Sequence, residues 1–205
     1  MKDLLQSISV HSCVIGLTGY MFFICLKYQT LFSLHPFCMT AAYVLLLTEA
    51  AFAFYGKYSL IPRNAAFHGW VMLLANLFSL VGFISVYLNK IYMSKSHFTS
   101  YHGQIGLAVI FHMIFQLFMG IMLQFYSKFK ALIFVPYRML RTFHLLSALL
   151  LIATSLLTVF LGFQSFWFAI TVGNVCRFLF SCSLLALAFL TLPKLYARSV
   201  VRLTA

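Results

Sequence analysis

The sequence has almost no acidic residues and few charges of either sign. Of its 205 residues only 2 are acidic, Asp3 and Glu49, and charged residues make up 8% of the chain. Hydrophobic residues make up 63%, and the mean hydropathy is +1.01. A water-soluble domain of this length would carry far more charge on its surface. The composition therefore excludes a soluble enzyme and predicts an integral membrane protein.

The sequence also lacks polar linkers, low-complexity segments and any C-x-x-C spacing. Its 5 cysteines lie in or beside apolar segments, which is typical of small residues packed in helices and not of a redox or metal site. The apolar stretch after residue 9 has no clear small-residue cleavage site, so we expect a retained first helix and not a signal peptide. We therefore expect one domain over residues 1–205.

The apolar runs are long and continuous, which excludes the short alternating segments of a transmembrane β-barrel. A helix needs about 20 apolar residues to cross a bilayer, and the chain accommodates six such runs. The sequence thus predicts an all-α membrane protein with six transmembrane helices. The expected spans are 9–26, 36–55, 67–88, 103–125, 143–163 and 166–192. Asn174 and Arg177 weaken the start of the last span, so its fully lipid-exposed part could begin near Val172.

The net charge of +12 comes from small basic groups between the apolar runs. Such scatter is typical of topology signals and lipid contact, and does not indicate a nucleic-acid-binding face. With six spans, ten basic residues fall on the side of the chain ends: Lys2, Lys57, Arg63, Lys128, Lys130, Arg138, Arg141, Lys194, Arg198 and Arg202. The other side carries Lys27, Lys90 and Lys95. The positive-inside rule then places both termini of this multi-pass protein in the cytoplasm.

Four of the 7 histidines stand where a polar or basic stretch turns into a long apolar run: His35, His68, His102 and His144. Ionisable side chains inside a membrane are costly and usually functional. Because successive helices cross in opposite directions, His35 and His102 share the non-cytoplasmic depth. His68 and His144 share the cytoplasmic depth. Topology alone therefore predicts two pairs.

Neutral imidazole binds zinc, copper and haem iron. A pair of histidines cannot complete a four-coordinate zinc site, although Cys38, one turn after His35, keeps a zinc alternative open. Two histidines that face each other from neighbouring helices supply both axial ligands of a six-coordinate haem. We therefore predict two haems held by helices two to five as a four-helix bundle, with their irons about 20 Å apart along the membrane normal.

Basic residues near the predicted cytoplasmic pair are Lys57, Arg63, Arg138 and Arg141. They would suit haem propionates or a small anionic reductant, or would serve as topology anchors. The corresponding candidates near His102 on the far side are Lys90, Lys95, His97 and Tyr101.

The other buried polar residues have structural interpretations. His112 falls near mid-membrane, between the two predicted pairs, so we expect it to be a hydrogen-bonded core residue. His11 begins the first helix and competes as a ligand for the cytoplasmic site. A lone carboxylate in the membrane is costly, so Glu49 is either protonated, paired with a basic group or positioned for proton or cofactor contact, and we expect a structural pair. Arg177 is an attractive partner for a haem propionate.

Four motifs open successive helices in a fixed order. They are Leu34-His35-Pro36 with Met39, Ala65-Ala66-Phe67-His68-Gly69-Trp70, Tyr101-His102-Gly103, and Arg141-Thr142-Phe143-His144. This ordered set resembles the eukaryotic cytochrome b561 family over nearly the whole chain, and is most similar to its short cytochrome b561 domain-containing members.

The resemblance implies two b-type haems, one ligated by His35 with His102 and the other by His68 with His144. It also implies electron transfer from cytoplasmic ascorbate to a non-cytoplasmic acceptor, either ferric iron or monodehydroascorbate. The family uses basic residues for ascorbate, which here correspond to Arg138, Arg141 and Arg63; homodimers are common in it.

We therefore expect an ascorbate-dependent transmembrane oxidoreductase that acts as a ferric reductase. Two other classes stay open. A transporter without a cofactor could relay protons through buried histidines, and would be colourless. A haem-binding anchor subunit would instead pass its electrons to a partner protein.

Overall fold

The computed structural model describes residues 2–55, 64–131 and 134–204, and in these ranges the chain forms helices and no strands. Within them, six helical spans are long and apolar enough to cross a membrane. They are Leu4–Tyr28, Leu31–Phe54, Ala65–Tyr92, Tyr101–Gln124, Tyr137–Phe163 and Phe166–Ala197. The predicted all-α membrane architecture is confirmed.

The first span is α1 (Lys2–Tyr28), and the second consists of three consecutive segments. These segments are α2 (Leu31–Thr40), the π-helix η1 (Ala41–Leu46) and α3 (Leu47–Tyr55). The remaining spans are α4 (Ala65–Tyr92), α5 (Tyr101–Gln124), α7 (Tyr137–Phe163) and α8 (Phe166–Thr204), and the short α6 (Tyr126–Phe129) follows α5.

Five of the six spans begin earlier than predicted, and in three of them a polar cap lies ahead of the apolar run. The side chains of Thr30, Asn64 and Ser100 accept hydrogen bonds from backbone N–H groups of the first turns of α2, α4 and α5. Such caps satisfy donors that a helix start would otherwise leave unpaired. The predicted starts at 36, 67 and 103 are therefore late against the observed 31, 65 and 101. His35 and His102, which the predicted spans left just ahead of their helices, consequently lie within α2 and α5.

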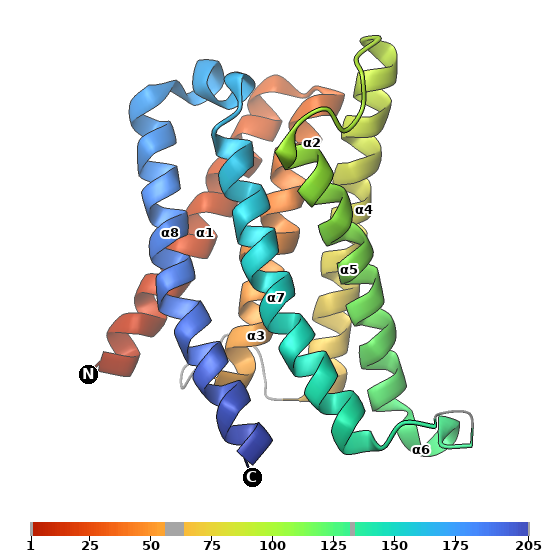
Figure 1. The fold of residues 1–205 in the computed structure, drawn as a ribbon. Coiled ribbons are helices and arrows are strands. Elements are labelled where there is room, and N and C mark those ends of the chain that lie inside the picture. Colours follow the sequence, from red (N-terminus) through yellow and green to blue (C-terminus); the bar gives the residue numbers. More distant parts are fainter. Residues whose placement is uncertain (1, 56–63, 132–133, 205) are drawn as a thin grey trace.

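The second span, α4, α5 and α7 form a closed ring. Along this ring α2 packs on α4, α4 on α5, and α5 on α7, while α7 returns to η1. The outer helices α1 and α8 pack on each other, α1 also contacting α2 and η1, and α8 contacting α7 (Figure 1). Helices two to five therefore form the bundle that the sequence predicts.

Figure 1 shows both chain termini at one end of the bundle, together with α6. The starts of α4 and α7 lie at this same end, which we call the termini end. The starts of α2, α5 and α8 lie at the opposite end. This alternation has the parity that six crossings require.

The π-helix interrupts the second span a little beyond Pro36. Proline has no backbone N–H to offer the preceding turn, and the Thr40 hydroxyl donates to the carbonyl oxygen of Pro36 at 2.5 Å. A π-turn takes up extra residues and rotates the face that follows it. Tyr43 within the π-helix and Ala50 beyond it are both buried, with exposed fractions of 1% and 0%.

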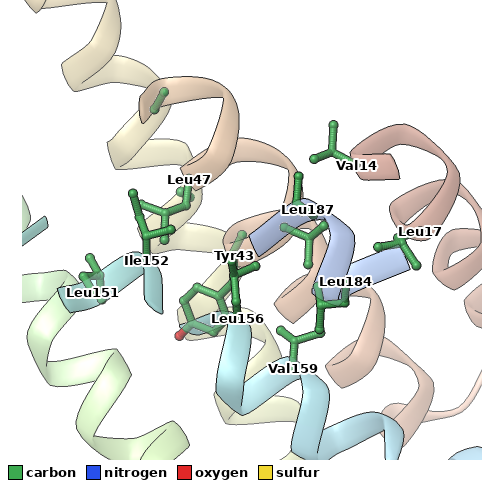
Figure 2. Packing of buried hydrophobic residues seen from close by; sticks show 14 of the residues in the cluster. Val14, Leu17, Tyr43, Leu47, Leu151, Ile152, Leu156, Val159, Leu184 and Leu187 are labelled. Atoms are coloured by element: carbon green, nitrogen blue, oxygen red, sulfur yellow. The ribbon is translucent and has the colours of Figure 1, made fainter. Parts of the chain in front are cut away.

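Buried apolar side chains from η1, α1, α7 and α8 meet in the middle of the molecule (Figure 2). Tyr43 lies among them, and its hydroxyl is hydrogen-bonded to the Ser79 hydroxyl at 2.5 Å. A hydrogen bond between membrane helices contributes on average about 0.6 kcal/mol. Close packing of apolar side chains therefore holds most of this interior together.

The last span is broken at Gly173, whose φ of 78° and ψ of 161° are not helical. Glycine is the residue that accommodates such a backbone. The break lies directly before Asn174, in the region where the sequence predicted a weak span. Beyond it the helix continues to Thr204, past the predicted end at 192.

Candidate functional site

His35 on α2 and His102 on α5 face each other at the end of the bundle opposite the termini. Their ring centroids are 5.9 Å apart and their planes meet at 87°. A metal held at about 2 Å from one nitrogen of each ring would separate the two ring centroids by about 6 Å. The structure thus brings together the two residues of the first predicted pair, at a spacing that suits one ion between them.

We call His35 and His102 the outer pair. Both of their rings are held by a hydrogen bond from Nδ1. The Nδ1 of His35 lies 3.0 Å from the carbonyl oxygen of Gly82 on α4. The Nδ1 of His102 lies 2.9 Å from the carbonyl oxygen of Thr158 on α7. Because a carbonyl oxygen only accepts, each Nδ1 carries the proton and donates it. The Nε2 of each ring then keeps its lone pair for a ligand.

His68 and His144 lie near the starts of α4 and α7, and both of these starts are at the termini end of the bundle. The Nδ1 of His68 donates to the carbonyl oxygen of Ala50 on α3 at 3.2 Å. The ring of His68 also packs against that of Phe54, with centroids 5.1 Å apart. His144 is half-buried, and its Nδ1 has no hydrogen-bond partner among the described residues. Three of the four histidines therefore share one hydrogen-bonding arrangement, and His144 differs.

Gly162 on α7 allows the backbone to approach His102. A Cβ at this position would lie 3.1 Å from Cε1 of His102 and 3.4 Å from its Nδ1. Contacts this short force a neighbour to move. At Gly120 on α5 the corresponding distance to Cε1 of His144 is 3.8 Å, an ordinary contact. The absent side chain of Gly162 is therefore part of the cradle for the outer pair.

An apolar cavity surrounds the outer pair. His35 and His102 line it together with aromatic side chains, among them Phe32, Tyr43 and Phe83. Sites for organic cofactors combine such apolar walls with a few placed polar groups. The cavity therefore suits a large, flat and mostly apolar group bound between the two rings.

Two of the four predicted far-side candidates, Lys90 and His97, line this cavity. The Lys90 ammonium donates to the carbonyl oxygen of Ser96 at 2.9 Å, and the His97 ring stacks on Tyr87 at 4.3 Å between centroids. The described residues that form the wall do not include Lys95, Tyr101 or Arg177. The structure therefore does not support Arg177 as a contact of a group bound there.

The predicted basic residues of the termini end are placed only in part. Arg138 and Arg141 are exposed in the first turns of α7, and Arg141 precedes His144 by three residues. Residues three apart on a helix lie on one face. Lys57 and Arg63 lie outside the described residues.

Three other polar residues singled out in the sequence, His11, Glu49 and His112, have partners within the protein. His11 on α1 and Glu49 on α3 form a contact of 2.6 Å between Nδ1 and Oε1. Glu49 is thus paired as expected, while the expected competition of His11 as a ligand is not supported. His112 is hydrogen-bonded to the Ser147 hydroxyl at 2.7 Å, as predicted, although it is only half-buried.

No group of three or more His, Cys, Asp or Glu side chains with metal-binding spacing occurs in the part of the chain that the structure describes. The zinc alternative at Cys38 therefore gains no third ligand there. A site with two protein ligands per metal, completed by a porphyrin, does not need one.

Sequence reasoning missed Gly82, Thr158, Gly162 and Gln116. The first two act through backbone carbonyls, which carry no residue-specific signal. Gly162 acts by having no side chain. Gln116 is the one with a sequence signal, since a polar amide in the middle of an apolar span needs a partner.

A model of the family described as Eukaryotic cytochrome b561 matches residues 34–169. The matched region begins one residue before His35 and contains all four paired histidines. The chain belongs to the cytochrome b561 family. Membership implies haem b as the cofactor. The residues present fit haem: the outer rings have the spacing for one ion, three Nδ1 atoms are fixed, and the outer cavity is apolar.

Curated relatives of this cytochrome b561 protein cover most of its length. The mouse (Mus musculus) protein named Transmembrane reductase CYB561D2 is 31% identical over 80% of this chain and 75% of its own length. The human (Homo sapiens) protein of the same name is 30% identical over 83% of this chain and 78% of its own length. The cattle (Bos taurus) protein is 30% identical over 80% and 75%, respectively.

Proposed function

We propose that this cytochrome b561 protein transfers electrons across a membrane through two b-type haems, from cytoplasmic ascorbate to an acceptor on the other side. The proposed axial pairs are His35 with His102 and His68 with His144. The observation that carries the proposal is the placement of two histidine pairs at opposite ends of one bundle, with outer rings 5.9 Å apart. The names of the relatives, transmembrane reductases, support the same reaction class.

When bound, each haem supplies an iron that gains and loses one electron. The histidines fix its position, because Nδ1–H bonds to backbone carbonyls hold the rings of His35, His68 and His102. His35 with His102, and His68 with His144, would hold the two haems, and a haem held by two histidines would transfer single electrons in preference to binding dioxygen.

The proposed donor side is the termini end. Arg138 and Arg141 are exposed at the start of α7, at the end of the bundle where His144 lies. Cations there attract and orient an anionic reductant such as ascorbate. Ascorbate gives up one electron and one proton and becomes monodehydroascorbate. We keep Arg63 in this proposed set on the family resemblance alone.

The proposed acceptor side is the opposite end, where Lys90 and His97 line the cavity of the outer pair. A cation at this wall favours an anionic acceptor, either a ferric chelate, which takes one electron to become ferrous, or monodehydroascorbate. The charge of Lys90 would equally suit a haem propionate. Both assignments place negative groups at the same wall.

The test uses purified full-length protein in sealed liposomes that contain ascorbate, with a ferric chelate outside. We expect haem absorption bands that change to the reduced form with internal ascorbate, and ferrous iron that appears outside only when the protein is present. A colourless protein would favour the cofactor-free transporter. A haem spectrum that ascorbate leaves unchanged would favour the anchor subunit.

A further inference from the structure

His144 is the exception among the four paired histidines. His35, His68 and His102 each donate Nδ1–H to a backbone carbonyl oxygen of another helix. The Nδ1 of His144 is buried and has no partner among the residues that the structure describes. A neutral imidazole that binds a metal through Nε2 must carry its proton on Nδ1, and this N–H almost always has an acceptor. His144 therefore needs one.

Gln116 on α5 is the residue beside it with an unused acceptor. Its side chain is 3% exposed, and its Nε2 donates to the backbone carbonyl oxygen of His144 at 3.0 Å. The other atom of the same amide, Oε1, is buried without a partner within the described ranges. A donor and an acceptor, both buried and both unsatisfied, thus belong to two residues that already touch. Buried polar groups are rarely left in this state.

The face of α5 that carries Gln116 also contacts the ring of His144. Gly120 lies one turn after Gln116 on the same face. A Cβ at Gly120 would lie 3.8 Å from Cε1 of His144, so the imidazole lies against this part of α5. The backbone and the ring of His144 are therefore both next to the same stretch of one helix.

We propose that Gln116 is the positioning residue of His144: its Oε1 accepts the Nδ1–H bond that orients the imidazole for its metal. This inference rests on the proposed axial role of His144. A glutamine is suited to the place because its amide can hold the backbone carbonyl through Nε2 and the ring through Oε1 at once. An acceptor on Nδ1 also makes the imidazole more basic, which favours ferric over ferrous iron.

The experiment compares the reduction potentials of the two haems in purified wild-type protein, Gln116→Met and Gln116→Glu, with ferric EPR spectra of each. Methionine keeps the length of the side chain and removes the strong acceptor. We expect Gln116→Met to raise the potential of the His68/His144 haem and to shift its EPR signal, with the other haem unchanged. Glutamate keeps an acceptor oxygen, so in Gln116→Glu that potential should stay at or below the wild-type value.

Gln104→Met is the matched control, because Gln104 lies on the same helix but is exposed and donates to the carbonyl oxygen of Phe98. This variant should change neither the reduction potential nor the EPR signal of the His68/His144 haem. If Gln116→Met loses its haem, Gln116→Asn serves instead, since the shorter side chain withdraws the oxygen and should give a shift of the same sign.

An unchanged potential and EPR signal in Gln116→Met, or in Gln116→Asn, would overturn the inference while leaving the proposed function intact. If His144→Ala removes no haem signal that the wild-type protein shows, the proposed function is overturned, and this inference with it.

Discussion

The imidazole rings of His35 and His102 stand nearly perpendicular, with planes at 87° and centroids 5.9 Å apart. They come from α2 and α5. The ring of His35 is fixed by the backbone carbonyl of Gly82 on α4, and the ring of His102 by that of Thr158 on α7. All four helices of the bundle therefore determine the geometry of this one pair.

The two histidine pairs should be separable by substitution. His35→Ala or His102→Ala should remove one haem, leave the other reducible by ascorbate, and stop ferric reduction across the liposome membrane. His68→Ala or His144→Ala should instead abolish reduction by ascorbate. Haem content and difference spectra measure both effects. His112→Ala is the control, because His112 is hydrogen-bonded to Ser147, and this variant should keep both haems. Equal losses of haem from all five variants would contradict the pairing.

Gly162→Ala should disturb the haem of His35 and His102, which we call the outer haem. Gly120→Ala should not disturb the haem of His68 and His144. The added Cβ would lie 3.1 Å from His102 in the first case and 3.8 Å from His144 in the second. Overpacking at a tight position costs about 1–3 kcal/mol. We expect lower occupancy or a shifted potential for the outer haem of Gly162→Ala alone. Equal behaviour of the two alanine variants would count against the cradle at Gly162.

The contact between His11 and Glu49 should be structural. Either single substitution, His11→Leu or Glu49→Leu, breaks this contact in the protein interior and should destabilise the protein by about 1–3 kcal/mol. The double substitution removes both polar groups and should recover much of that loss. Denaturant unfolding in detergent, followed by haem absorbance, measures the three variants. A double variant less stable than either single one would contradict this role.

Arg138→Ala with Arg141→Ala should weaken the use of ascorbate. Both side chains are exposed at the termini end, so their loss should raise the KM for ascorbate several-fold with little change in the unfolding midpoint. The effect should shrink at high salt, because screening already weakens the attraction. Lys128→Ala, an exposed cation on α6, is the matched control. A KM unchanged in the double variant and raised by Lys128→Ala would refute the assignment.

The six spans, and the end of the bundle at which each of the four histidines lies, could be predicted because both depend on local signals. Long apolar runs give the spans, and their number gives the depth at which each histidine lies. The starts of α2, α4 and α5 were placed late, because hydropathy is blind to the caps Thr30, Asn64 and Ser100. Caps act through hydrogen bonds to the first turn and not through apolar character.

The surroundings of the histidines could not be predicted. His35 and its acceptor Gly82 are 47 residues apart, and His102 and Thr158 are 56 apart. Such contacts depend on how the helices rotate and slide against each other. The π-helix at Ala41–Leu46 adds a further rotation that no periodicity indicates. Glu49 was expected to be paired, but its partner His11 on α1 follows only from the packing of α1 on the second span.

The most direct test of the account is the haem content of the purified wild-type chain, measured together with a spectroscopic titration of its reduction by ascorbate. The account predicts two b-type haems per chain, which reduce in two distinguishable steps, and loss of one step when either member of a pair is changed to alanine. A colourless chain, or a single haem that survives alanine substitution at His35 and at His68, would contradict it.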